Sequence, residues 1–207
     1  MNRTRRDLLI AAVLIGFSPP VRAEDPTAES AVYRALLAYF AAKAGADAEA
    51  AHLFIAEKPA RLDEALPQGP GETPRPKALE ALVPGTTESL RNRFLQVLES
   101  SEPIDARWLA SEGRLKVTAV SQYEPEGVFT TWADFRARFP EAKGLLRLSR
   151  VAIDDDRQTA LVYAGYWCGG TCGGGYLFLL ASLNNGWRVV HEQQLWVAAN
   201  DRSVDEA

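Results

Sequence analysis

Two segments in the first half of the chain repeat apolar residues at three- and four-residue steps. This spacing places apolar side chains on one face of a helix, so helices are predicted at 27–43 and 86–98. The repeating positions are Val32, Ala35, Leu36, Tyr39 and Phe40 in the first segment, and Leu90, Phe94, Leu95, Val97 and Leu98 in the second. A shorter helix is predicted at 131–139, because Pro140 ends it.

The last third of the chain alternates apolar and polar residues, which is typical of strands. Four strands are predicted, at 145–153, 159–167, 176–182 and 187–197. The alternation changes phase inside the first of them, which predicts a bulge near Ser149 and Arg150. Short turns join the strands, among them Asn184-Asn185-Gly186, so the pattern predicts an antiparallel meander.

Two shorter strands are predicted at 51–56 and 115–123. Helices followed by a meander, without alternating strands and helices, favour an α+β fold in which N-terminal helices pack on a C-terminal twisted antiparallel sheet. The segment 59–84 carries six of the twelve prolines and is predicted to be a long surface loop. We expect this loop inside one domain, because the residues before it are too few for a separate core.

The N-terminus has the pattern of a cleavable export signal. Basic residues precede an uncharged apolar run at 8–17, and Val21-Arg22-Ala23 supplies a small-x-small cleavage pattern. The run is shorter than the roughly 20 residues that span a bilayer. We therefore expect a signal at 1–23 and one domain at 24–207 that is not in the membrane. Arg5 and Arg6 resemble a twin-arginine signal, and the general secretory route is the alternative.

The charge balance argues against nucleic acid as a partner. The chain has 23 basic and 27 acidic side chains, and without residues 1–23 these become 19 and 26. The net charge of about −7 would repel a phosphate backbone, and no cluster of basic and aromatic residues offsets it.

One pattern in the predicted strands resembles a family of exported bacterial proteins of unknown function. The residues that carry the resemblance are Phe139-Pro140, Gly144, Leu148-Ser149-Arg150-Val151, Ala160-Leu161-Val162-Tyr163, Cys168-Gly169 and Cys172-Gly173-x-Gly175. It covers about 70 residues, from Trp132 to Val197. The resemblance implies a periplasmic or extracellular bacterial location and implies no activity. At the level of fold alone, the layout is similar to cystatin-like and NTF2-like proteins.

Cys168 and Cys172 are the only cysteines, and a close pair in an exported protein is normally a disulfide. Because the loop between the two cysteines is short, closing it adds little stability. We therefore expect the bond mainly to shape the tip of a hairpin. Two alternatives stay open. In the first, the pair is a redox-active disulfide. In the second, its two thiolates bind zinc or copper(I) together with His191. No cofactor is predicted.

His191 and Glu192 are neighbours on a predicted strand and therefore point to opposite faces, so they cannot form a dyad. We expect His191 to share a face with Val189 and Leu195 and to be a hydrogen-bonded sheet histidine, and His52 to be similar. The alternative is a small-molecule enzyme whose cavity uses His191 or Asp134 as general base.

The other motifs do not indicate catalysis. Asp154-Asp155-Asp156 is predicted to be a solvated turn, since it lacks the ligand spacing of a calcium loop. No nucleophile elbow or phosphate-binding loop is present in the sequence, and the glycines at 173–175 precede a strand. The leading hypothesis is a non-enzymatic exported domain that binds a protein or small-molecule ligand through its sheet face and the disulfide hairpin.

Overall fold

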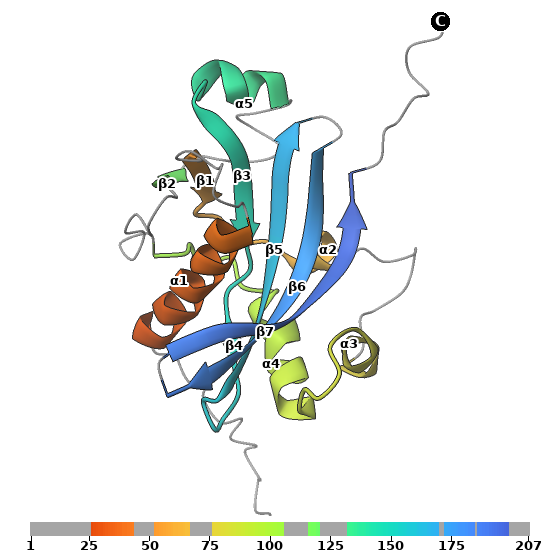
Figure 1. Ribbon diagram of the computed structural model, residues 1–207. Coiled ribbons are helices and arrows are strands. Elements are labelled where there is room, and N and C mark those ends of the chain that lie inside the picture. Colours follow the sequence, from red (N-terminus) through yellow and green to blue (C-terminus); the bar gives the residue numbers. More distant parts are fainter. Residues whose placement is uncertain are drawn as a thin grey trace, which may run out of the picture.

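A mixed seven-stranded sheet with helices on both faces forms the centre of the molecule (Figure 1). The computed structural model describes residues 26–43, 52–66, 76–105, 116–120, 132–169, 172–184 and 186–198. In chain order the elements are α1 (Pro26–Lys43), β1 (His52–Ala56), α2 (Leu62–Ala65), α3 (Pro76–Leu82), α4 (Glu88–Val97), β2 (Lys116–Val120), α5 (Trp132–Arg138), β3 (Ala142–Leu148), β4 (Ala152–Ile153), β5 (Thr159–Gly169), β6 (Cys172–Leu183) and β7 (Gly186–Val197). The predicted α+β class is confirmed.

The sheet order is β2-β1-β3-β5-β6-β7, with β4 paired to β5 outside this path. From β3 to β7 each neighbour on the path is antiparallel, which confirms the predicted meander. The other edge differs, because β1 pairs in parallel with both β2 and β3. Parallel neighbours need a crossover connection, and helices lie between these strands along the chain. The sheet is therefore mixed rather than antiparallel throughout.

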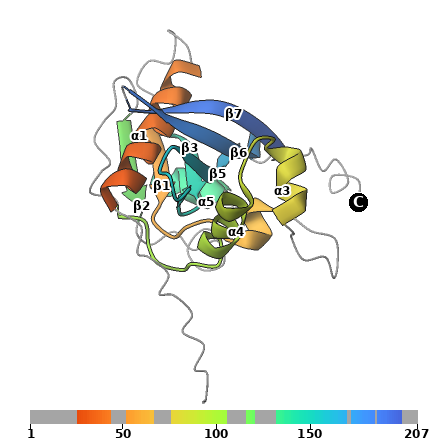
Figure 2. The same ribbon diagram turned by 90° about the horizontal axis from the view of Figure 1, so that it is seen from below.

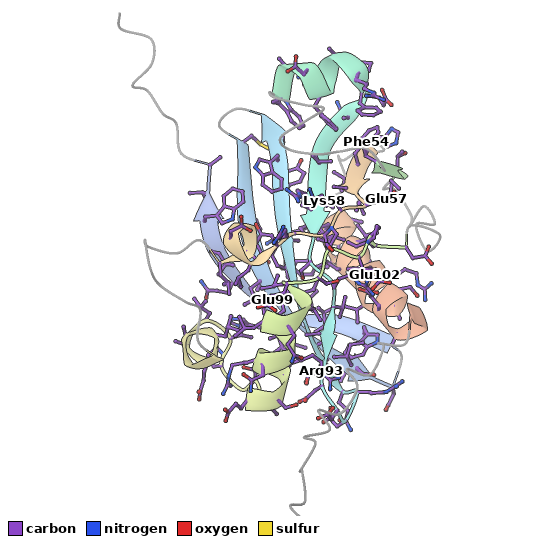
Figure 3. All side chains as sticks on the ribbon, turned by 180° about the vertical axis from the view of Figure 1, so that it is seen from behind. Phe54, Glu57, Lys58, Arg93, Glu99 and Glu102 are labelled. Carbon is purple, nitrogen blue, oxygen red and sulfur yellow. A yellow bond between two sulfur atoms is a disulfide. The ribbon has the colours of Figure 1, made fainter. Side chains whose placement is uncertain are left out.

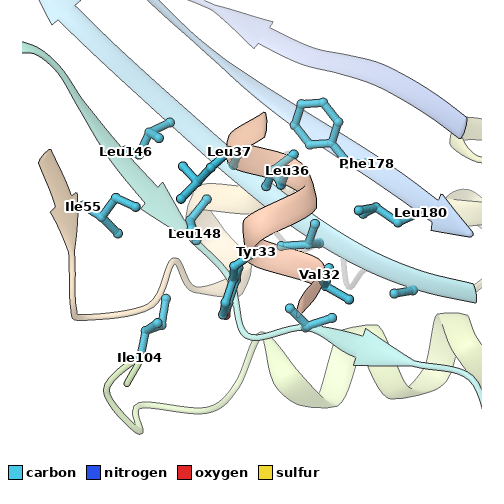
Figure 4. Packing of buried hydrophobic residues seen from close by; sticks show 14 of the residues in the cluster. Val32, Tyr33, Leu36, Leu37, Ile55, Ile104, Leu146, Leu148, Phe178 and Leu180 are labelled. Atoms are coloured by element: carbon cyan, nitrogen blue, oxygen red, sulfur yellow. The ribbon is translucent and has the colours of Figure 1, made fainter. Parts of the chain in front are cut away.

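Helix α1 covers one face of the sheet. Its residues Val32, Tyr33, Leu36 and Leu37 follow the helical spacing and are at most 1% exposed. Figure 4 shows them packed against side chains of β1, β3 and β6, which include Ile55, Leu146, Leu148, Phe178 and Leu180. Burial of each large apolar side chain contributes about 1.5–3 kcal/mol, so this face holds the helix on the sheet.

The start of α1 is tied to the strand break between β3 and β4. Arg150 donates from Nε and Nη2 to the two carboxylate oxygens of Glu29, at 2.7 and 2.9 Å. Tyr33 Oη lies 2.8 Å from the carbonyl oxygen of Ser149, to which it donates. The phase change at Ser149 and Arg150 had predicted a bulge, and the chain leaves the strand at 149–151. Arg150 belongs to the pattern that resembles the family of exported bacterial proteins. Its partner, Glu29, gives this residue a structural role.

The opposite face carries α2, α3, α4 and α5. Figure 2 shows α1 on one side of the sheet and α3 and α4 on the other. The predicted surface loop at 59–84 contains α2 and α3, and its residues Ala60, Ala65, Leu79 and Val83 are buried against the sheet. The loop prediction is wrong for these parts. Pro76 is the first residue of α3, where its missing N–H costs nothing, so the proline count overstated the irregular structure.

Helix α4 is fixed to the turn between β4 and β5. Thr87 caps the helix by accepting a hydrogen bond from Leu90 N at 3.1 Å, and its hydroxyl donates to Asp154 at 2.8 Å. Arg93 forms an ion pair with Asp155 at 2.7 Å. The chain turns at Asp155 and Asp156, as predicted, and this acidic turn anchors a helix.

Candidate binding surface at the disulfide end of the sheet

The hairpin between β5 and β6 lies at an end of the sheet that α1 does not reach (Figure 1). In the opposite view, no described helix is drawn over the ends of β5 and β6 at this hairpin (Figure 3). Four aromatic rings and four glycines meet there. We call these eight residues the aromatic end: Gly144, Gly165, Tyr166, Trp167, Gly174, Gly175, Tyr176 and Trp196.

Two tryptophans lie against glycines on the face that carries α2 to α4. A Cβ atom on Gly165 would be 2.6 Å from Cη2 of Trp167, and one on Gly175 would be 2.0 Å from Nε1 of Trp196. Such distances are far inside van der Waals contact, so both rings occupy space that any other residue would fill. The ring centroids of Trp167 and Trp196 are 5.4 Å apart at an interplanar angle of 42°. We call this side the tryptophan face.

A buried phenol orients Trp196. Its Nε1–H donates to Tyr163 Oη at 3.1 Å, and Tyr163 is fully buried. Both tryptophans are half-buried, and each has its ring against a glycine. Arg147 lies opposite Gly165 in the ladder and is 4% exposed, so its charge is held beside the tryptophan face and not on it.

Two tyrosines also lie against glycines, on the face that carries α1. A Cβ atom on Gly144 would be 2.1 Å from the Tyr166 ring, and one on Gly174 would be 3.0 Å from the Tyr176 ring. Tyr166 Oη donates to the carbonyl of Lys143 at 3.1 Å, and Tyr176 Oη accepts from Gln194 Nε2 at 3.1 Å. Burial raises the pKa of Tyr166, so the phenol is neutral at neutral pH.

Cys168 and Cys172 form the predicted disulfide, with Cα atoms 5.0 Å apart. Cys168 directly follows Trp167, and Cys172 pairs with Gly169 at the start of β6. The bond therefore closes the hairpin beside the tryptophan face. Since both sulfurs are in the bond, neither is a thiolate ligand, and within the described ranges no group of three or more His, Cys, Asp or Glu side chains is arranged to hold a metal ion.

His191 faces α3 and not the aromatic end. Its Nε2 is 3.2 Å from the carbonyl oxygen of Leu82, and it lies opposite Leu179 in the ladder. The prediction that it shares a face with Val189 is wrong. A register shift between these two residues turns Val189 onto the α1 side, where it packs against that core. Leu195 packs on the α3 and α4 side, as His191 does.

Glu192 points to the α1 face, as expected for the neighbour of His191. Its carboxylate accepts hydrogen bonds from Tyr39 and from Lys43, at 2.5 and 2.6 Å. Although burial acts to raise it, these bonds and the charge of Lys43 lower the pKa of Glu192. This group links the end of α1 to β7, which is a structural role.

The structure does not bring Asp134 and His191 together. Asp134 is an exposed residue of α5, a helix that packs on β1 and β3, whereas His191 lies on β7, three strands beyond β3.

His52 is buried and places Nε2 2.7 Å from Thr118 Oγ1. Its Nδ1 is 3.9 Å from Glu141, too far for a hydrogen bond, so hydroxyl, imidazole and carboxylate are not linked as a catalytic triad.

The sequence reasoning missed the aromatic end. A usable signal was the alternation of glycine with Tyr or Trp along 165–167 and 174–176, because glycine inside a strand marks a close approach of another group. The partners across strands were not readable without the register.

No protein-family model, curated protein or solved structure matches this chain. The candidate function therefore rests on the geometry of the aromatic end. None of the described helices is long and apolar enough to span a membrane.

Proposed function

We propose that this protein is an exported, non-enzymatic binding domain that takes up its ligand, a protein segment or a small molecule, on the aromatic end. One observation carries the proposal. Four half-buried aromatic rings lie against glycines at an end of the sheet that α1 does not reach. Aromatic side chains that combine an apolar surface with a polar atom are the groups that dominate binding sites.

The rings are held in place before any ligand arrives. Trp196 is hydrogen-bonded to Tyr163, Tyr176 to Gln194, and the disulfide closes the hairpin next to Trp167. Binding to rings that are already ordered costs little side-chain entropy. Rigid aromatic groups of this kind support tight binding without a catalytic centre.

The glycines support a functional reading of the same surface. A glycine in a strand interior costs about 0.5–1 kcal/mol relative to alanine, and four of them underlie the rings. Packing of the rings on the glycines offsets part of this cost. A sheet end selected for stability alone would use larger strand residues at these positions, which supports selection for the flat ring surface.

The location belongs to the same proposal. We infer that residues 1–23 direct the chain to the periplasm or the extracellular space of a bacterium through the twin-arginine route. The Cys168–Cys172 disulfide supports an oxidising compartment. The resemblance to exported bacterial proteins, carried by the pattern around the same cysteines, supports it as well.

Tryptophan fluorescence tests the binding function, because Trp167 and Trp196 lie at the surface in question. The exported protein is titrated with a panel of peptides, oligosaccharides and aromatic small molecules. We expect a ligand whose binding changes the emission and is weakened at least about tenfold by Trp167→Ala and by Trp196→Ala. Trp187→Phe is the control, since Trp187 packs on the α1 core. Ligands that bind the wild type and both alanine variants equally would contradict the proposal.

A further inference from the structure

We propose that the outer edge of β7 is an interface with a second copy of this chain, in which the two β7 strands pair antiparallel about Gln193. The proposal goes beyond the proposed function, because it concerns the edge of the sheet and not the ligand of the aromatic end. Strand β7 stands last in the sheet order, and no described strand pairs with its outer side. This edge strand of 12 residues therefore offers backbone N–H and C=O groups to a partner strand.

The exposed apolar residues of the sheet gather on the hairpin that carries this edge. Among the described residues, the exposed large apolar side chains are Leu183, Val190 and Val197, which are 51%, 53% and 59% exposed. Leu183 ends β6, and both valines lie on β7. The edge therefore combines open backbone groups with apolar side chains that a partner strand would cover.

Few charges protect the edge. Lysine and other charged side chains usually keep an edge strand from pairing with another chain. The Lys, Arg, Asp and Glu residues of β7 are only Arg188 and Glu192. Glu192 forms an ion pair with Lys43 of α1, at 2.6 Å from Nζ to Oε2. Over 189–197 the edge therefore carries no lysine, no arginine and no unpaired carboxylate that would repel a second strand.

Two bulges decide which strand fits this edge. The ladder between β6 and β7 has no partner for Val190, which lies between Val189 and His191, and none for Leu195. At each bulge the alternation of side chains between the two faces changes phase. A regular strand would match the faces of β7 only over 191–194, so it is a poor partner for the whole edge.

A second copy of β7 has its phase changes at matching places. The directly opposed pairs in the proposed arrangement are Val189 with Val197, His191 with Leu195, Glu192 with Gln194, and Gln193 with its own equivalent. The ladder to β6 places the first and third of these pairs on the α1 side, and the other two on the α3 and α4 side. In each pair both residues therefore lie on the same side of the continuous sheet, as antiparallel pairing requires.

The same pairing covers the exposed valines. Val197 of one copy lies opposite Val189 of the other, and Val190 lies opposite Trp196. Pairs of β-branched and aromatic residues stabilise antiparallel sheets, and the two-fold symmetry makes each contact twice. Both strands are already ordered, so pairing does not cost the entropy of ordering a free peptide. These observations favour a second copy over a segment of another protein.

Sedimentation equilibrium of the exported protein tests the proposal. We expect the wild type to dimerise with a Kd of about 1–100 µM, because the interface is small. Gln193→Lys and Gln193→Glu should each weaken the dimer at least about tenfold, because like charges then meet at the two-fold axis. An equimolar mixture of these two variants should dimerise again, because opposite charges meet there.

Leu183→Lys is the matched control, because Leu183 is exposed but lies on β6, outside the paired segment. If far-UV circular dichroism shows that a Gln193 variant does not fold, Val190→Lys replaces it, with the same expected loss. A wild type that stays monomeric at about 1 mM would overturn the proposal. Equal dimerisation of Gln193→Lys and Leu183→Lys would overturn it as well, and so would a mixture of Gln193→Lys and Gln193→Glu that dimerises no better than each variant alone.

Discussion

The indole of Trp196 lies over Gly175, the residue opposite it on β6, so closely that a Cβ atom there would be 2.0 Å from Nε1. The same ring donates a hydrogen bond to Tyr163 on β5. One side chain on β7 therefore crosses β6 and reaches β5. This arrangement makes the glycine as important to the surface as the tryptophan, and it leads to the first prediction.

Gly175→Ala should displace the Trp196 ring and lower the free energy of unfolding by about 1–3 kcal/mol, although alanine is the better strand residue. Urea unfolding measures the loss, and near-UV circular dichroism reports the changed indole. Gly169→Ala is the matched control in the same hairpin, because its Cβ would meet no atom closer than 3.7 Å. Equal stability of both variants would show that the ring is not seated on Gly175.

Arg150→Met should destabilise the protein by about 3 kcal/mol, because it leaves the carboxylate of Glu29 buried without its cation. The side chains of Arg150 and Glu29 are 18% and 8% exposed. The double variant Glu29→Gln, Arg150→Met should lose less than Arg150→Met alone. Arg93→Met is the control at a pair whose carboxylate, that of Asp155, is 74% exposed, so the expected loss is below about 1 kcal/mol. Similar losses for Arg93 and Arg150 would argue against a special role of the buried pair.

Glu192 should contribute to the acid sensitivity of the fold. Its pKa is lower in the folded protein than in the unfolded chain, so its stabilising effect is complete above the unfolded pKa of about 4.3 and is lost as the pH falls through the folded pKa. Glu192→Gln should therefore be less stable at neutral pH and lose less stability on acidification. Urea unfolding of both proteins from neutral pH to about pH 3 measures the difference. If the free energies of unfolding of the wild type and of Glu192→Gln fall in parallel with pH, the acid sensitivity comes from other carboxylates.

The double change Cys168→Ser, Cys172→Ser should lower the Tm by only a few degrees, or about 1–2 kcal/mol, because the loop that the disulfide closes is short. The far-UV circular dichroism spectrum should keep the signal of the sheet. Intact-mass analysis of the wild type should show two hydrogens fewer than the reduced chain. Two free thiols in protein purified aerobically after export would speak against the disulfide.

Replacing Arg5 and Arg6 by Lys should block export if the twin-arginine route is used, because that route reads the guanidinium pair and not charge alone. The fraction of protein in the periplasm, measured by immunoblot, checks this. The exported wild type should begin at Glu24 by N-terminal sequencing. Undiminished export of the lysine variant would assign the protein to the general secretory pathway.

The elements and bonds that depend on nearby residues were predictable from the sequence. Helical spacing predicted α1 and α4, alternation predicted the meander from β3 to β7, and the spacing of the two cysteines predicted their bond. Gly186, the last residue of the predicted tight turn and the first of β7, has a φ of 109°. These features follow from local periodicity, turn chemistry and short loops, which do not require knowledge of the rest of the fold.

Only the tertiary structure decided what depends on register and on distant packing. Two register shifts in β7 place Val189 and His191 on opposite faces and set Trp196 against Gly175, and no pattern along the chain predicted them. The parallel pairing of β1 with β3 and the burial of α3 within the proline-rich segment likewise depend on partners far along the chain. By itself the sequence determined the class of fold and the disulfide, because these follow from neighbouring residues. The aromatic end arose only from pairing across strands, because its rings and glycines meet through the ladder and not along the chain.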